Sequence, residues 1–269
     1  MEDAGYYNVS SFIKDLVQED GVSFKPGTTW PRLVARIRGD RELRALYSQY
    51  LEVVEVRIKT EVASLLTQKY GPFGYLDSRN FHSWQRHANF LSNLGRELNR
   101  ERELFIDTAG GETHDRMSIW SIIDYVSFGI LTKSLYRAMK DEDKVAIARA
   151  FGIEDECTFS GYLRSLTVVR NVCAHHSRLF RRRFVDTCPV QQEALEILHD
   201  VEPGATVDTR SMFAVTLALI TLLPEDEALN FIAGLSDFSA GCEPYDLHNC
   251  GFNSLWPRYL ADVVKSRHP

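Results

Sequence analysis

The sequence contains few cysteines and no C-x-x-C pair. Its five cysteines are odd in number and widely spaced, a pattern typical neither of a disulfide-stapled secreted domain nor of a standard zinc module. Cys242, His248 and Cys250 could approach one another closely enough to hold a metal, but a second pair of ligands is missing nearby. We therefore expect reduced thiols, no metal site and no cofactor.

Long apolar runs are also missing. The longest, Met212 to Leu223, has twelve residues and includes two threonines, whereas a bilayer-spanning helix needs about 20 apolar residues. The N-terminal M-E-D-A-G-Y-Y has no basic stretch followed by an apolar one, as an export signal would have. We expect a cytoplasmic protein without a membrane partner.

Alternating strand patterns and internal repeats are scarce, and helical periodicity prevails. Residues 42–70 lack glycine and proline, and their apolar side chains recur at three- and four-residue steps. Proline at position 31 is typical of the first turn of a helix. Further helices are expected after Asp77 and over residues 118–139, 144–151, 160–184, 190–199, 209–223, 225–235 and 254–264.

These patterns predict an all-α fold. No composition break divides the chain, so we expect one helical domain over residues 1–269. Within it, residues 1–30 are rich in loop-forming residues, residues from about 40 to 200 form the core bundle, and residues 205–269 form C-terminal helices.

One segment has no acidic residue. Cys157 to Val185 contains six arginines and neither Asp nor Glu, while the rest of the chain carries 25 Lys and Arg against 37 acidic residues, a balance of −12. A positive segment on a negative protein indicates local binding of a polyanion.

If Ser160 to Phe184 is one helix, this segment has two faces. One carries an apolar stripe, and the other carries Asn171, His175, Arg178 and Arg182 at steps of four, three and four. Arginine pairs with phosphate oxygens, and histidine exchanges protons near neutral pH. Asn171, one turn before His175, is placed to orient its ring. A structural interpretation stays open, with the histidines satisfied in the core and R-L-F-R-R-R as a solvated face.

Other notable residues favour structural roles. Glu55 and Lys59 are spaced as an ion pair on one helix face. Trp84, Trp120 and Phe128 are expected in the core. Trp30 and Trp256 could stack on bases, although packing is the more frequent fate of tryptophan.

The block R-N-V-C-A-H-H-S-R-L-F (170–180) resembles the signature of the Abi-like proteins, the AbiD/AbiF type of bacterial abortive-infection family, which belong to the HEPN superfamily. The resemblance covers nearly the whole chain. It includes these further segments, in the family's order: G-Y-Y-N-V-S-S-F (5–12), F-K-P-G-T-T-W (24–30), the Glu55 and Arg57 region, Y-G-P-F-G-Y-L-D-S-R-N-F (70–81), S-I-W-S-I-I-D-Y-V-S-F-G-I-L (118–131) and G-F-N-S-L-W (251–256).

The resemblance implies a HEPN-like helical bundle with additional peripheral helices. It also implies an R-x4-H nuclease motif in which Arg170, Asn171 and His175 are catalytic and two copies meet in a homodimer. RNA is then the substrate, held by His176, Arg178, Arg181 and Arg182. The motif offers no carboxylate cluster for Mg²⁺ and no glycine-rich phosphate loop, so we expect metal-independent RNA cleavage in phage defence.

Two alternatives stay open. HEPN folds also serve as non-catalytic RNA-binding or dimeric regulatory modules, and a neutralising RNA or protein partner is a further expectation of this class.

Two departures from the family pattern concern the N-terminus. Relatives generally have more helical sequence before G-Y-Y, so we expect a shortened or alternative start, and Asn8 stands where arginine is often found.

Overall fold

The computed structural model describes residues 6–13, 16–104, 117–241 and 247–267. These residues form helices and two isolated β-bridges, Val17 with Phe24 and Phe81 with Met139, and no β-strand is found among them. The all-α prediction is therefore confirmed. None of the described helices combines the length and the apolar character that crossing a membrane requires.

Most expected helices are present with shifted ends, and α1 lies within the segment expected to be loop-rich. The α-helices are α1 (Tyr6–Ile13), α2 (Trp30–Tyr70), α3 (Trp84–Leu104), α4 (Ile119–Ile122), α5 (Phe128–Ile130), α6 (Tyr136–Ala138), α7 (Asp141–Ala150), α8 (Glu156–Ala174), α9 (Gln192–Val201), α10 (Met212–Leu222), α11 (Glu225–Gly241) and α12 (Trp256–Ser266). The shorter elements are the 3₁₀ turns η1 (Gly74–Leu76), η2 (Ser78–Asn80), η4 (Ile123–Tyr125) and η6 (Leu247–Cys250), and the π-helix η5 (Leu131–Leu135).

Helix α2 is longer than the predicted 42–70 and has 41 residues. It begins after Thr29, whose Oγ1 accepts the backbone N–H of Arg32 at 3.4 Å, as an N-cap residue does. Pro31 follows in the first turn, where its missing N–H costs nothing. Gly39 lies inside the helix without ending it, because neighbours on both sides contribute buried side chains.

The single helix expected over residues 118–139 is wrong. Ser118 and Ser127 each cap a new helix, accepting the backbone N–H of Ser121 and of Ile130 respectively. Val126 between them is extended, with ψ of 112°. Serine competes for backbone hydrogen bonds and favours helix starts over helix interiors, so this apolar stretch is divided into short helical pieces.

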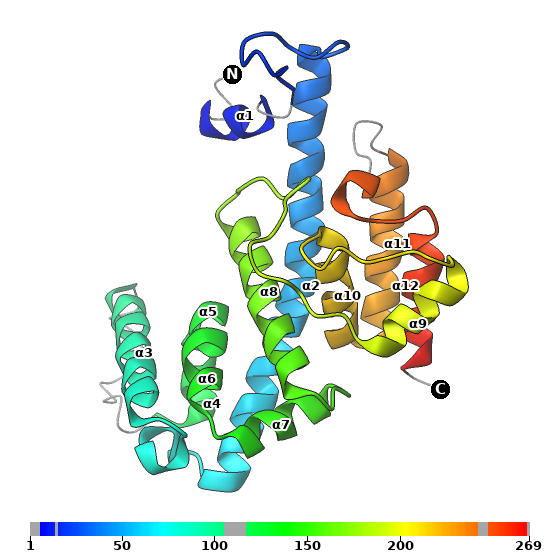
Figure 1. Ribbon diagram of the computed structural model, residues 1–269. Helices are drawn as coiled ribbons and strands as arrows, with labels where there is room; N and C mark the ends of the chain where they lie inside the picture. Colours follow the sequence, from blue (N-terminus) through cyan, green and yellow to red (C-terminus); the bar gives the residue numbers. More distant parts are fainter. Residues whose placement is uncertain (1–5, 14–15, 105–116, 242–246, 268–269) are drawn as a thin grey trace. The chain divides into compact units, whose positions relative to one another are not determined.

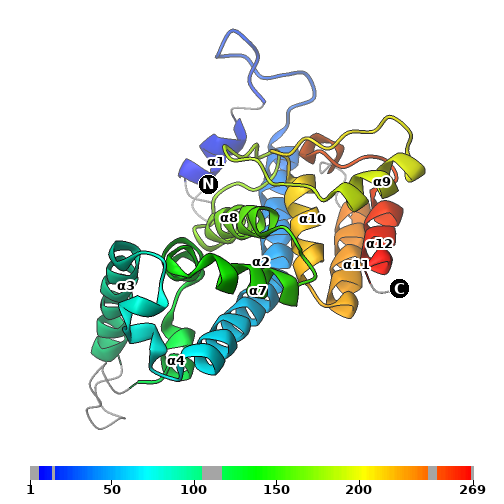
Figure 2. The same ribbon diagram turned by 60° about the horizontal axis from the view of Figure 1, so that its bottom comes forward.

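The chain divides into two compact units, and the first combines residues 1–52 with 168–269. Its core is α10, all eleven residues of which are buried. Helices α10, α11 and α12 lie side by side, with α9 against α12 (Figures 1 and 2). The hydroxyl groups of Tyr47 and Thr216 are hydrogen-bonded at 2.6 Å, and Phe231 packs edge-on against Tyr47.

The second unit spans residues 53–167. Helix α3 packs beside α5, η5 and α6 (Figure 1), and Phe159 packs between Tyr136 and Phe151. The predicted ion pair of Glu55 with Lys59 is present at 3.2 Å.

The tryptophan predictions have mixed outcomes. Phe128 is buried as expected, but Trp84 and Trp120 are 67% and 45% exposed, so their assignment to the core is wrong. Trp84 is the first residue of α3 and precedes its buried stripe, which begins at His87, whereas Trp120 lies on the side of α4 away from the buried Ile119 and Ile122. Trp256 is buried, whereas Trp30 is half exposed.

Candidate functional site

Helix α8 ends at Ala174, ten residues before the predicted end at Phe184. The backbone N–H of His176 bonds to the carbonyl of Cys173 at 3.1 Å, and that of Ser177 bonds to the carbonyl of Val172 at 3.0 Å. This pair of bonds is a Schellman motif, which closes a helix and satisfies its last carbonyls. The helical stripe through Arg178 and Arg182 is therefore wrong, since both follow the helix end.

The motif requires a left-handed residue, which is usually glycine. Here it is His176, with φ of 54°. Histidine is several times more frequent in this region than most residues with a side chain, but it still carries a cost of about 1–2 kcal/mol. Arg181 is also left-handed, with φ of 53°. Two left-handed residues thus lie within the six residues from His176 to Arg181.

The catalytic candidates lie around this helix end. Arg170 and Asn171 are half-buried in the last turn of α8, and His175 is exposed just after it. The backbone N–H of His175 still bonds to the carbonyl of Asn171 at 2.9 Å. The helical register therefore continues to His175, one turn beyond Asn171.

Two finer expectations concern the side chains of Arg170 and Asn171. Arg170 precedes His175 by five residues, about 140° around a helix, so its guanidinium reaches the histidine face only through the length of its side chain. Among the described residues, no hydrogen bond joins the Asn171 side chain to the His175 ring. The proposed orienting role of Asn171 stays a prediction.

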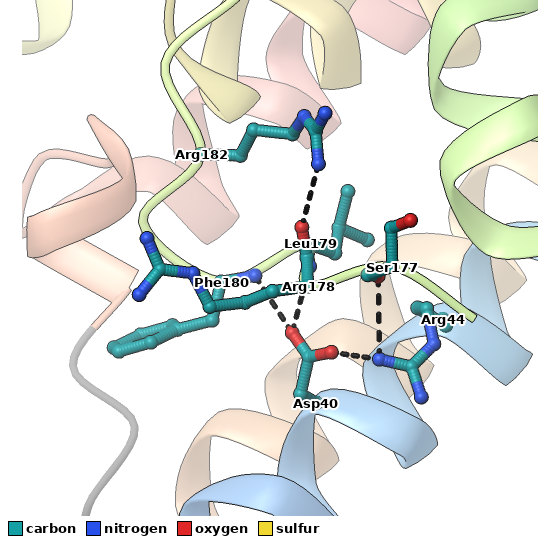
Figure 3. A network of polar contacts seen from close by, with 7 residues as sticks. All are labelled: Asp40, Arg44, Ser177, Arg178, Leu179, Phe180 and Arg182. Atoms are coloured by element: carbon teal, nitrogen blue, oxygen red, sulfur yellow. Dashed lines mark hydrogen bonds and ion pairs between the residues drawn. The ribbon is translucent and has the colours of Figure 1, made fainter. Parts of the chain in front are cut away.

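A buried carboxylate on α2 anchors the segment after the motif (Figure 3). Asp40 is fully buried, and its Oδ1 accepts the backbone N–H of Leu179 at 2.9 Å and that of Phe180 at 2.7 Å. Its Oδ2 accepts a hydrogen bond from the Arg44 guanidinium, one turn further along α2. Arg44 in turn donates to the carbonyl of Ser177 at 3.4 Å. We call Asp40 and Arg44 the α2 clamp.

Three of the arginines in the positive segment have partners in the same unit. Arg178 donates to the carbonyl of Ser11 in α1 at 2.8 Å, and its guanidinium lies 5.8 Å from the centre of the Phe12 ring. Arg182 donates to the carbonyl of Arg178 at 3.0 Å (Figure 3). Arg183 pairs with Asp208 at 3.0 Å.

The remaining substrate-binding candidates are exposed. His176 and Arg181 both present their side chains to solvent. The backbone N–H of Arg181 donates to the Sγ of Cys250 at 3.4 Å, so its backbone is held while its side chain is not part of the core. The positive segment therefore combines anchored arginines with exposed ones.

Sequence reasoning missed the α2 clamp, although a signal was present. Asp40 precedes Leu43 by three residues and Tyr47 by seven, which places it on the apolar stripe of α2. A carboxylate on such a stripe is almost never buried without a partner, and Arg44 at the i+4 position is the obvious one.

Cys173, a residue within the motif, is buried. Burial raises the pKa of the Cys173 thiol to about 11, partly opposed by a hydrogen bond with Ser48 and the charge of Arg44. Cys173 therefore belongs to the packed side of α8.

Within the described ranges, no group of three or more His, Cys, Asp or Glu side chains is placed to hold a metal ion. Cys242, one of the three metal candidates, lies outside these ranges.

The model of the Abi-like protein family matches residues 1–181, which include α8 and the turn after it. The chain belongs to the Abi-like protein family. Membership in this family indicates a role in abortive infection, a form of bacterial defence against phage. No curated protein and no solved structure matches the chain.

Proposed function

We propose that this protein is a metal-independent endoribonuclease of abortive infection, with His175, Arg170 and Asn171 at its active site. The observation that carries the proposal is the position of His175. This side chain is exposed at the end of α8, one turn from Asn171, in a segment with six arginines and no carboxylate. The HEPN assignment, to which the R-x4-H motif belongs, is part of the same proposal.

The reaction is an internal transfer at phosphorus. The 2′-oxygen of a ribose attacks the adjacent phosphorus, and the bond from phosphorus to the 5′-oxygen of the next nucleotide breaks. The 2′-hydroxyl proton leaves to a base, and the 5′-oxygen receives a proton from an acid. The products are a 2′,3′-cyclic phosphate, or the 3′-phosphate formed from it, and a 5′-hydroxyl.

Each residue type suits one role in this reaction. The imidazole of His175 can take or give the proton near neutral pH. The guanidinium of Arg170 can neutralise charge that builds up on the phosphoryl oxygens in the transition state. Asn171 can orient the imidazole or contact the phosphate, and its carbonyl already fixes the backbone of His175.

Two proton transfers call for two groups, whereas one chain supplies one R-x4-H motif. A homodimer in which two motifs face one another would supply two histidines and two arginines to a composite site. The alternative second group is His176, which is adjacent to His175 and also exposed.

The decisive experiment is incubation of the purified protein with single-stranded and structured RNAs in excess EDTA. Arg170→Ala and His175→Ala are assayed in parallel, with Arg41→Ala as an exposed arginine control, and the ends of the fragments are analysed. We expect cleavage that survives EDTA, leaves cyclic phosphates and disappears in both motif variants. Cleavage that His175→Ala leaves intact would refute the proposed site.

A second candidate function is an RNA-binding or regulatory module without cleavage. It is favoured by the exposed side chain of Arg181 in a segment of six arginines and no carboxylate, which can hold a phosphate backbone without any catalytic histidine. Salt-sensitive RNA binding without cleavage in the same assay would support this function.

A further inference from the structure

A small cavity in the first unit brings together two segments that are far apart in the sequence. It has a volume of about 230 Å³. One wall is the turn Lys25–Thr29 together with the first turns of α2, and the other includes Arg181 from the positive segment. The turn belongs to the F-K-P-G-T-T-W block, for which neither catalysis nor the core packing described above gives a use.

Four basic side chains line this cavity, namely Lys25, Arg32, Arg36 and Arg181. No carboxylate is among the described residues of its lining. Two of them, Lys25 and Arg36, also take part in further interactions, and the four side chains together give the cavity a positively charged lining. The cavity is therefore suited to a compact anion.

Backbone contacts hold two of these residues at the cavity. Gly27 is left-handed with φ of 77°, and its carbonyl accepts a hydrogen bond from the Arg32 guanidinium at 3.1 Å. Arg181 is held by its left-handed backbone and by the bond from its N–H to Cys250. Because Lys25 and Arg36 take part in further interactions, the test substitutes Arg32 and Arg181.

We propose that this cavity, named the phosphate pocket, binds a phosphate group of a nucleic-acid strand. Guanidinium groups form paired hydrogen bonds with phosphate oxygens, and the volume suits one phosphate with part of a sugar. An acidic peptide would need cations spread along an extended surface. The choice of RNA as the strand rests on the proposed function, but binding in the pocket requires no cleavage.

Binding can be measured without cleavage by using a fully 2′-O-methylated oligoribonucleotide, which has no 2′-hydroxyl to attack. Its affinity for the full chain is measured by fluorescence anisotropy over a range of salt concentrations, with and without a 5′-phosphate. Arg32→Ala removes one pocket charge. Arg181→Asn removes another while keeping a residue that tolerates the left-handed backbone. Arg41→Ala, an exposed arginine on the same helix but outside the lining, is the matched control.

We expect each pocket variant to weaken binding by about 5- to 20-fold and to reduce the salt slope by about 0.7. The control should change affinity by less than about 2-fold, as expected for an exposed charge outside the site. If only the 5′-phosphorylated strand responds to the variants, the pocket holds a terminal phosphate. If both strands respond equally, it holds an internal one. Thermal melting of each variant verifies that the fold is intact.

Three results would overturn the pocket: no binding of either strand, unchanged binding in both pocket variants, or an equal loss in Arg41→Ala. Its failure is distinguishable from that of the nuclease. Cleavage that needs His175, together with unchanged binding in the pocket variants, would leave the nuclease standing without the pocket. Binding that depends on the pocket residues, without any cleavage, would support the phosphate pocket and refute the nuclease.

Discussion

The buried carboxylate of Asp40 accepts the backbone N–H of Phe180 at 2.7 Å. A residue at the eleventh position of the long helix α2 would otherwise have no reason to be acidic, because its side chain faces the core. The bond ties the segment after the R-x4-H motif to α2, and the same carboxylate receives Leu179 and Arg44. The path of the chain after His175 is thus set by one buried side chain of α2.

Asp40→Ala should lower the free energy of unfolding by roughly 3–5 kcal/mol, because it leaves the charge of Arg44 and two backbone N–H groups without their acceptor. Asp40→Asn keeps one oxygen for the backbone and should cost less. Urea unfolding measures both effects. Glu42→Ala, an exposed acidic residue on the same helix, should stay within about 0.5 kcal/mol of the wild type. Equal stability of Asp40→Ala and Glu42→Ala would contradict the clamp.

His176→Gly should stabilise the protein by about 1 kcal/mol, because glycine adopts the left-handed backbone without a Cβ penalty. His176→Val should destabilise it by a similar amount, since a β-branched residue fits this conformation poorly. Thermal or urea unfolding of the two variants gives the comparison. If glycine and valine give the same stability, the left-handed turn is not needed to close α8.

Arg178→Ala should reduce stability by about 1–2 kcal/mol, because it removes a charged hydrogen bond to α1 and a contact with the Phe12 ring. Its RNA affinity should fall less than that of Arg181→Asn, since Arg178 is engaged inside the unit and Arg181 lines the phosphate pocket. Unfolding and anisotropy measurements on the same preparations separate the two effects. If Arg178→Ala lowered RNA affinity as much as Arg181→Asn does, Arg178 would be a substrate-binding residue after all.

Stability should decline at alkaline pH, in part because of Cys173. Burial raises the pKa of this thiol from 9.0 to about 11, so the folded protein holds the proton more tightly than the unfolded chain does. The contribution is fully present below pH 9 and is lost as the pH rises towards 11, by up to roughly 2–3 kcal/mol. Burial also raises the pKa of Tyr47, which acts in the same direction at higher pH.

Urea midpoints measured near pH 8 and near pH 10.5 test this decline. Cys173→Ala should be less stable than the wild type at the lower pH because it leaves a small cavity. It should nevertheless lose less stability between the two pH values. A parallel decline in both proteins would mean that the thiol does not contribute.

The all-α class could be predicted because apolar side chains recur at helical steps in nearly every segment. Buried residues of α2 such as Leu43, Tyr47 and Val54 were identified in this way. Helix ends were predicted less well. Ser118 and Ser127 start new helices inside an apolar stretch. The spacing of apolar side chains does not show where a serine side chain replaces a backbone hydrogen bond, so these helix starts were missed.

The candidate site was predicted in part. Asn171 and His175 do lie one turn apart, because the helical register lasts until His175. The end of α8 was missed because its left-handed residue is a histidine, where glycine would have marked the stop. The α2 clamp and the phosphate pocket depend on residues that are more than 130 positions apart in the chain, and only the tertiary fold brings such residues together.

Arg32, Arg36, Asp40 and Arg44 follow one another at four-residue steps and therefore lie on one face of α2. Their orientation relative to one another depends on the number of residues between them. The first two line the phosphate pocket and the last two form the clamp. Inserting a single residue at Gly39 would rotate the clamp by about 100° relative to the pocket, although every side chain would still be present. This stretch of α2 can therefore vary in composition more readily than in length. A substitution would weaken either the phosphate pocket or the α2 clamp, whereas an insertion would remove the alignment between them.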